Sequence, residues 1–476
     1  MSGTITSNFL YSSLTVVLNV AVPLVTYPYI ARVLGPENMG RLGIAGSFAN
    51  YFIAAASLGF ATYGVRTIAK SRQRSSREFA GQSTELFVLS LISGALAAAA
   101  FYFTIAIVPR YRAELPLFAL FGITILTTNA SIEWFFRGVE EFRFIGLRNV
   151  LLQILSVTLL FIVIRNDGDT LAYAALLSGI AILGASLNLG AARRFVKPAF
   201  TAIHPGRHLG PMLVFTLFAF AITAYTNLDF LFLGLASDPL QAGLYTISIR
   251  LTRMIVTVTA TLSAVLLPRL SHLAGNDEDE FHRILNNSAR AIMLFSLPAA
   301  TGIAATSNDI ARFFGGPGFA DAAGSLRILA LMVPVVACSN FLQLQILVPR
   351  GRERQTLLSF GVGIAVTAIS MAFLVRPFGH RGAALAMLFG ECSVLIFHSL
   401  LCLRFERASL PKIEYLPRYL VAALLSAGVA WLPAAFMAPG ILRLCLSVTA
   451  GVIAYLLYLL VVRDDFLMEV MKKARK

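Results

Sequence analysis

Apolar stretches of about twenty residues recur along the whole sequence, and this recurrence limits the possible folds most strongly. A helix needs about 20 mostly apolar residues to cross the hydrocarbon core of a bilayer. Hydrophobic residues make up 57% of the 476 positions and charged residues only 13%, against about 25% charged in soluble domains. Continuous apolar runs also exclude a β-barrel, whose strands alternate over about ten residues. The sequence therefore predicts an all-α integral membrane protein.

We predict about fourteen transmembrane helices from these stretches. The first stretch lacks a charged leader and is too long for the apolar core of a cleaved signal peptide, so it is counted as a span. The predicted spans are 8–30, 42–62, 80–108, 114–136, 145–164, 170–190, 210–235, 240–267, 288–307, 324–348, 357–375, 382–403, 419–437 and 443–462.

The distribution of positive charge predicts the orientation. A formal net charge of +15 is compatible with nucleic-acid binding, but most of the Lys and Arg residues fall in alternate loops. This is the pattern that places basic loops in the cytoplasm, and it predicts cytoplasmic N- and C-termini. Arg148 is assigned to a cytoplasmic loop and Arg443 to an outside loop. We expect the basic loops to contact anionic membrane lipids and not nucleic acid.

Matching motifs indicate an internal repeat. Arg66 matches Arg269 at a shift of 203 residues, and Arg137-Gly138 matches Arg350-Gly351 at a shift of 213. The matches fall at equivalent ends of predicted spans. Because each half has an even number of six helices, the two halves share one orientation, and such parallel repeats are a known architecture of transporters. The predicted division is an N-terminal six-helix lobe, a C-terminal six-helix lobe, and two additional helices with a basic tail, at residues 1–209, 210–403 and 404–476.

The sequence has none of the motifs that hold a nucleotide or a metal. It contains no phosphate-binding GxxxxGK[ST] loop, no HExxH and no CxxC pair. His204 and His208 are four residues apart, but Pro205 and Gly206 between them argue against a helical metal-binding pair. No cofactor and no metal are therefore expected.

Ionisable residues inside the spans are the candidate functional residues, because a charge at the bilayer centre costs roughly 2.5–3.5 kcal/mol and needs an aqueous cavity or a partner. Arg250 and Arg253 are three residues apart on one face of a predicted helix, and Asp229 lies in the preceding span. They form either a cationic cavity wall suited to an anion or a structural ion pair. Glu133 and Glu391, near span ends, are either proton or cation carriers or interfacial residues.

Several motifs resemble one known family. They are residues 28–36 (PYIARVLGP), 58–70 (LGFATYGVRTIAK), 134–140 (WFFRGVE), 228–230 (LDF) and 267–271 (LPRLS). The resemblance is to Wzx-type oligosaccharide flippases of the multidrug/oligosaccharidyl-lipid/polysaccharide exporter superfamily, and it extends over the first twelve predicted spans.

The resemblance implies two six-helix lobes in a V around a central cavity, with extra helices at the C-terminus. It implies translocation of a polyprenyl-pyrophosphate-linked glycan, for O-antigen or another exported polysaccharide, across the bacterial inner membrane by alternating access coupled to an ion gradient or the membrane potential. A polysaccharide polymerase and a chain-length regulator are the implied partners. The substrate-binding residues carried over are Arg32, Asp229, Arg250, Arg66 and Arg269, and Arg253 joins them through its position beside Arg250.

Three alternatives follow from the same observations. A lipid II flippase and a cation-coupled multidrug exporter belong to the same superfamily, although paired arginines suit an anion better than a cationic drug. A membrane glycosyltransferase or polymerase would need catalytic groups in an outside loop. The longest predicted outside loop, near 306–323, offers Asp309, Arg312 and Asp321.

Overall fold

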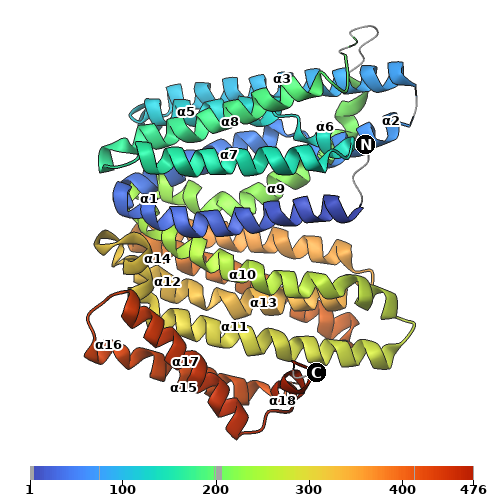
Figure 1. Cartoon of the computed structure of the whole chain (residues 1–476). Coiled ribbons are helices and arrows are strands. Elements are labelled where there is room, and N and C mark those ends of the chain that lie inside the picture. The colour runs from blue at the N-terminus through green and yellow to red at the C-terminus, as the bar shows by residue number, and fades with distance from the viewer. Residues whose placement is uncertain (1–4, 74, 198, 200–205, 412, 475–476) are drawn as a thin grey trace. The chain divides into compact units, whose positions relative to one another are not determined.

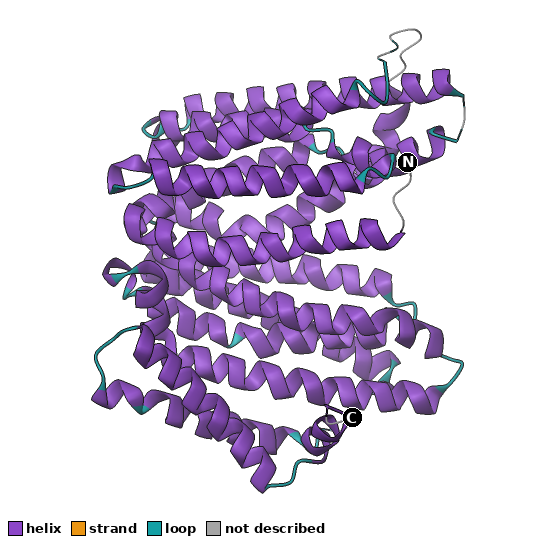
Figure 2. Ribbon diagram, viewed as in Figure 1, coloured by secondary structure: helices purple, strands orange, loops and turns teal. Residues whose placement is uncertain are grey.

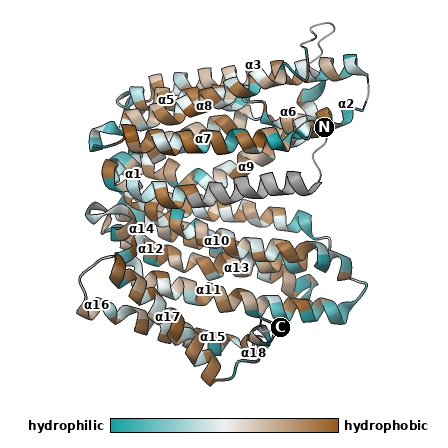
Figure 3. Ribbon diagram, viewed as in Figure 1, coloured by the Kyte–Doolittle hydropathy of each residue, from teal (hydrophilic) through white to brown (hydrophobic). Residues whose placement is uncertain are grey.

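The computed structural model describes residues 5–73, 75–197, 199, 206–411 and 413–474. Across these residues the regular structure is helical and no strand is present (Figure 2). Hydrophobic residues run along the helices, whereas hydrophilic residues gather at helix ends and in the connections (Figure 3). Large apolar side chains such as Phe373 and Val461 are 74% and 80% exposed, as expected for surfaces that contact lipid. The predicted all-α membrane class is confirmed.

Eleven helices in the described part of the chain are long and apolar enough to cross a membrane. The number is twelve if Val22–Ala56 and Phe60–Ser71, bent by 46°, form one span. The predicted number of fourteen stays a prediction. One of the eleven is 53 residues long, which would extend about 80 Å at 1.5 Å per residue, more than twice the thickness of the hydrocarbon core.

The chain divides into two compact units, residues 1–231 and 232–476, and each is described by itself. The three-part division predicted above stays a prediction. The helices of the first unit are α1 (Ile5–Ala56), η1 (Phe60–Gly64), α2 (Val65–Ser71), α3 (Ser76–Ile107), α4 (Pro109–Arg112), α5 (Leu115–Ala130), α6 (Glu133–Gly138), α7 (Phe142–Val163), η2 (Asp167–Asp169), α8 (Thr170–Ala192) and α9 (Gly206–Ala236), which continues across the boundary.

In the first unit, α5 packs against α1, α3 and α8, and α7 packs against α1 and α8. Figure 1 shows α3, α5, α7 and α8 running alongside one another. At one end of this bundle, α2 and α6 lie together. Their buried side chains join those of α3 in an aromatic-rich cluster that includes Phe60, Ile68, Leu86, Trp134 and Phe136. This cluster positions the short helix α6, which carries the candidate site.

The second unit contains α10 (Pro239–Leu273), α11 (Glu278–Gly315), η3 (Pro317–Phe319), α12 (Ala322–Ala330), α13 (Met332–Phe341), η4 (Leu342–Leu347), α14 (Glu353–Phe405), η5 (Arg407–Ser409), α15 (Leu416–Trp431), α16 (Pro433–Phe436), α17 (Ile441–Val461) and α18 (Asp465–Ala474). The central helix is α11, which contacts α10, α12, α13, α15 and α17. Phe281, Tyr419 and Tyr455 are buried where α11, α15 and α17 meet. The two helices predicted as additions therefore pack on the core of this unit.

Several long helices begin at a side chain that accepts a hydrogen bond from the first turn. Ser75 accepts from the Glu78 amide at the start of α3, at 3.3 Å. Asp238 accepts from the Gln241 amide at the start of α10, at 2.8 Å. Such caps satisfy amide groups that have no intrahelical partner. They fix where each helix starts, and so at which depth its side chains lie.

The long helix α14 consists of two helices joined at Gly379, whose φ of 53° and ψ of −128° are not helical. A backbone amide next to the break has a side-chain partner, because the Gln241 side chain of α10 accepts a hydrogen bond from the His380 amide at 3.1 Å. A Cβ atom at Gly382, just after the break, would overlap the Leu374 carbonyl group. The sharp reversal of the chain therefore requires glycine at position 382.

We expect Gly382→Ala to lower the apparent Tm of the purified protein in detergent, because backbone cannot move aside for the new methyl group. Overpacking of this kind costs about 1–3 kcal/mol. The matched control is Gly361→Ala in the same helix, where a Cβ atom meets nothing within 4 Å. The control should be neutral or stabilising by about 0.5–1 kcal/mol. Equal Tm values for the two variants would contradict this account of the break.

Candidate functional site

The candidate site is built at a break between α5 and α6. Ile132 adopts a left-handed conformation with a φ of 42°, which is strained for a β-branched residue. The break is held by side chains. The Ser131 hydroxyl donates to the Thr128 carbonyl group at 2.7 Å, and the Asn188 amide of α8 donates to the Ser131 carbonyl group. Glu133 therefore opens a new helix inside an otherwise apolar segment.

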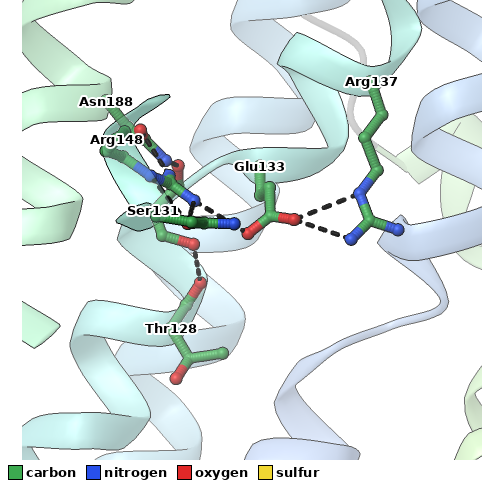
Figure 4. Close-up of polar contacts among 7 residues, drawn as sticks. Thr128, Ser131, Glu133, Arg137, Arg148 and Asn188 are labelled. Carbon is green, nitrogen blue, oxygen red and sulfur yellow. Dashed lines mark hydrogen bonds and ion pairs between the residues drawn. The ribbon is translucent and has the colours of Figure 1, made fainter. Parts of the chain in front are cut away.

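The Glu133 carboxylate bridges two arginines (Figure 4). Its Oε1 atom accepts from Arg137 Nη2 at 2.7 Å and Nε at 3.1 Å. Its Oε2 atom accepts from Arg148 Nη2 at 3.2 Å. Arg148 also donates to Asn188 at 2.5 Å and to Asn149 at 2.6 Å. The Asn188 side chain thus holds both the arginine and the helix break.

Exposure rises across this network. The Arg148 side chain is 7% exposed, that of Glu133 32% and that of Arg137 54%. The buried end is neutralised by one carboxylate, whereas the exposed end presents a guanidinium group. Two arginines against one carboxylate leave one net positive charge. Such a cluster can hold an anion at its exposed edge, where a phosphate oxygen would replace or join the Glu133 carboxylate.

A second buried polar cluster joins α3 to the start of α9. The Glu85 carboxylate accepts from Arg207 at 2.6 Å and contacts His208 Nε2 at 2.9 Å. His208 Nδ1 is hydrogen-bonded to the Tyr63 hydroxyl at 2.8 Å. His208 is therefore held by a carboxylate and a phenol. The other member of the histidine pair considered from the sequence, His204, lies outside the described residues.

In the second unit, a buried ion pair corrects part of the sequence analysis. The predicted outside loop near 306–323 is wrong, because α11 continues to Gly315 and then Pro317–Phe319 forms a further turn. Asp309 lies inside α11 and pairs with Arg443 of α17, and both side chains are under 10% exposed. Arg443 is thus a helix residue, as is Arg148 of α7, and neither belongs to a loop. Asp309 is not available as a loop catalyst.

Ion pairs also anchor one end of the second unit. Arg269 pairs with Glu280 at 2.9 Å. Arg350 makes two hydrogen bonds to the Glu278 carboxylate, at 2.7 and 2.6 Å. These hydrogen bonds raise the pKa of the Arg350 guanidinium above its ordinary value. Both arginines therefore have carboxylate partners beside the start of α11, which fits a structural anchoring role.

The remaining predicted residues differ in burial. Arg32 on α1, Arg66 on α2 and Arg250 on α10 are exposed, and Arg253 is half-buried. Asp229 on α9 is fully buried and Glu391 on α14 is 7% exposed. Asp229 and Arg250 belong to different units, so their predicted pairing stays a prediction. Of the predicted site residues, the structure assigns a carboxylate–arginine network to Glu133 and carboxylate partners to Arg269.

Sequence reasoning did not identify Arg148 as a site residue, because it assigned Arg148 to the basic cytoplasmic loop before the span. A signal was present. Arg148-Asn149 lies six residues into α7, and Asn188 interrupts the apolar helix α8. Two polar groups at intramembrane positions of consecutive helices are expected to find each other.

Long apolar helices with charges satisfied by intramembrane partners define a multi-pass membrane fold. The solved structures agree on the fold. The structure is similar to the lipid II flippase MurJ in an inward closed conformation, with a TM-score of 0.76 and 14% identity over 96% of this chain and 100% of that one. It is also similar to an inward-facing multidrug resistance MATE family transporter of the MOP superfamily, with a TM-score of 0.62 and 17% identity over 83% of this chain and 95% of that one.

The sequence comparison gives the family. The model of the polysaccharide biosynthesis protein family matches residues 5–274, more than half of the chain, and the chain belongs to this family. A protein of Escherichia coli (strain K12) named "Putative O-antigen transporter" is 21% identical over 401 residues, which cover 81% of this chain and 94% of that protein. A protein of the same name from Shigella dysenteriae is 20% identical over 80% of this chain and 95% of that protein.

Both of these relatives are named as transporters and neither as an enzyme. The predicted resemblance to oligosaccharide flippases of the exporter superfamily is confirmed. The prediction of a transporter, and not of a membrane glycosyltransferase or polymerase, is confirmed as well.

Glu133→Gln is expected to lower the apparent Tm far more than Arg137→Gln. Loss of the carboxylate leaves the buried Arg148 charge with amide partners only, and breaking a buried pair costs about 3–5 kcal/mol. The exposed Glu133–Arg137 pair contributes about 0–1 kcal/mol. The measurement is thermal unfolding of the purified variants in one detergent. The double variant Glu133→Gln/Arg148→Met should recover part of the loss, and equal Tm shifts for the two single variants would refute the assignment.

Proposed function

We propose that the chain translocates a polyprenyl-pyrophosphate-linked oligosaccharide from the cytoplasmic to the periplasmic leaflet of the bacterial inner membrane. The transport mode is alternating access, coupled to an ion gradient or to the membrane potential, with both termini in the cytoplasm. Membership of the polysaccharide biosynthesis protein family supports a role in glycan export. Similarity to a lipid II flippase in fold and to relatives named O-antigen transporters supports a lipid-linked glycan as the substrate.

One observation carries the proposal for this chain: two arginines are accessible deep within α10. Arg250 and Arg253 lie eleven and fourteen residues after Pro239, or about 16 and 21 Å along the helix. Arg250 is exposed and Arg253 is half-buried. A guanidinium group in hydrocarbon costs roughly 2.5–3.5 kcal/mol and needs an aqueous space or a partner, and the exposure of Arg250 favours an aqueous space on its side of the helix. A pyrophosphate is the group that two arginines on one helix face would bind.

The other predicted residues take supporting roles in this proposal. Arg32, which is exposed three residues before the break in α1 at Gly35, is the proposed substrate-binding cation of the first unit. Asp229, which is buried on α9, stays a proposed substrate-site residue of the first unit. Arg66 and Arg269 are weaker candidates for substrate binding, and the pairing of Arg269 with Glu280 favours an anchoring role for Arg269.

Ion coupling is assigned to a buried carboxylate. Asp229 and Glu391 are both under 10% exposed and can change charge when a proton or cation binds. Glu133 is a poorer candidate, because two arginines already hold its carboxylate in the charged form. We therefore propose Asp229 or Glu391 as the coupling residue and an organising role for Glu133.

An apolar cavity in the second unit suits the isoprenoid tail. It has a volume of about 490 Å³ and is lined by residues of α10, α11, α15 and α17, including Phe295, Gly302, Val452 and Leu456. The Asp309–Arg443 pair joins two of these helices and so keeps the walls together. An aliphatic chain lying here would stay out of water while its pyrophosphate reaches the arginines.

Two other substrates remain to be tested. Lipid II also carries a pyrophosphate and an isoprenoid tail, so the arginines do not discriminate against it. A cationic drug would be repelled by Arg250 and Arg253, and this disfavours the multidrug exporter alternative. The polymerase and chain-length regulator remain proposed partners.

We expect Arg250→Gln and Arg253→Gln each to reduce glycan export by about 10- to 100-fold, because a hydrogen bond to a charged group contributes about 1.5–3 kcal/mol. Lysine at either position should retain part of the activity, since it keeps the charge and loses the two-point contact. The measurement is surface polysaccharide in a strain lacking the native protein and expressing each variant at equal level.

The matched control is Arg354→Gln, which removes an exposed arginine near the start of α14. It should export at the level of the unmodified protein. Normal export by the double variant Arg250→Gln/Arg253→Gln would overturn the proposed pyrophosphate site.

A further inference from the structure

The first unit also contains a cavity, and its lining suggests a ligand other than the transported substrate. It has a volume of about 260 Å³ and lies between α3, α6, the end of α8 and the segment that follows it. Its walls are mainly apolar and aromatic, with Phe87, Trp134, Phe135 and Leu189 among them, and Arg193 also lines it. The cavity is thus apolar with a cation at one side.

Two residues that line this cavity carry buried donors without a hydrogen-bond partner among the described residues. The Ser83 hydroxyl oxygen and the Trp134 Nε1 atom are buried, and neither makes a hydrogen bond within the described part of the chain. The residues are 4% and 7% exposed. An indole N–H can only donate, and a buried donor without an acceptor is costly. A ligand that supplies oxygen acceptors would remove this cost.

From the positions of its lining residues along α3 and α8, we infer that the cavity lies near the boundary between headgroups and hydrocarbon. Leu189 belongs to the last turn of α8, which ends at Ala192, and Arg193 follows as an exposed residue. Ser83 is the eighth residue of α3, about 10 Å from its start. Tryptophan side chains gather at this level of membrane proteins. The ester carbonyl groups of a phospholipid lie here, between the phosphate and the acyl chains.

We propose that this cavity binds one anionic glycerophospholipid. An acyl chain contacts Phe87, Phe135 and Leu189, the ester carbonyl oxygens accept from Ser83 and Trp134, and the phosphate binds Arg193. A polyprenyl phosphate fits less well, because its chain carries no oxygen beyond the phosphate. Cytoplasmic leaflets are rich in anionic lipids, which matches the predicted side of Arg193.

The bound lipid would influence the charge network described above. Trp134 directly follows Glu133, and Ile132, which also lines the cavity, is the strained residue of the α5–α6 break. The Trp134 ring stacks on Phe60 at 5.5 Å, so a lipid on its other side would hold the indole between two apolar surfaces. Lipid occupancy is therefore expected to stabilise the break and the Glu133–Arg148 pair.

Trp134 reports on the cavity directly. The chain has two tryptophans, so Trp431→Phe leaves Trp134 as the only indole. This variant is placed in phosphatidylcholine vesicles, and acyl-brominated phosphatidylglycerol or acyl-brominated phosphatidylcholine is titrated in, because bromine quenches indole fluorescence on contact. We expect half-maximal quenching at an about fivefold lower fraction of phosphatidylglycerol, the effect of one arginine near an anionic lipid surface.

Three comparisons make the test decisive. Arg193→Gln should abolish the preference for phosphatidylglycerol, whereas Arg193→Lys and Arg354→Gln should keep it. Ether-linked brominated phosphatidylglycerol, which lacks ester carbonyl groups, should quench less effectively. Equal quenching by both headgroups would mean ordinary lipid contact and would overturn the proposal. Unbrominated compounds can also be added as competitors that relieve the quenching. Relief by glycerol phosphate alone would overturn the proposal. Relief by undecaprenyl phosphate as effective as that by unbrominated phosphatidylglycerol would also overturn it.

Discussion

A peptide group inside a bilayer can satisfy its N–H and C=O groups only within the protein, because hydrocarbon offers neither donor nor acceptor. This constraint makes each break in a helix conspicuous, since the freed groups need a side-chain partner. At Gly379 the partner is Gln241, which accepts from the next amide. At Ile132 it is Asn188, which donates to the Ser131 carbonyl group. The polar residues of these apolar helices thus permit the chain to bend.

The same constraint governs charge. Three carboxylates each hold a buried cationic or basic side chain of another helix: Glu133 with Arg148, Glu85 with His208, and Asp309 with Arg443. Arg250 and Arg32, in contrast, are exposed on apolar helices. Under the proposed function, the buried pairs hold helices together and the exposed arginines contact the substrate.

The transporter class came from the family resemblance, whereas hydropathy and charge distribution were sufficient to predict the all-helical membrane fold and most helix positions. They left the number of spans open, because the helices predicted on either side of Gly35 and Gly379 run into one another in the structure, as α1 and α14. They also could not predict the buried pairs. Asp309 and Arg443 are 134 positions apart, and each alone resembles an ordinary interfacial residue. Pairing depends on helix packing, which a single sequence does not specify.

The central claim is that this chain moves a lipid-linked glycan between leaflets. The most direct test uses a bacterial strain that lacks it, with polyprenyl-pyrophosphate-linked repeat units quantified and probed from the periplasmic face with a membrane-impermeant glycosidase. The account predicts that complete repeat units accumulate and stay inaccessible to the glycosidase until the protein is restored. Accumulation of accessible but unpolymerised units would contradict it, because the block would then follow translocation.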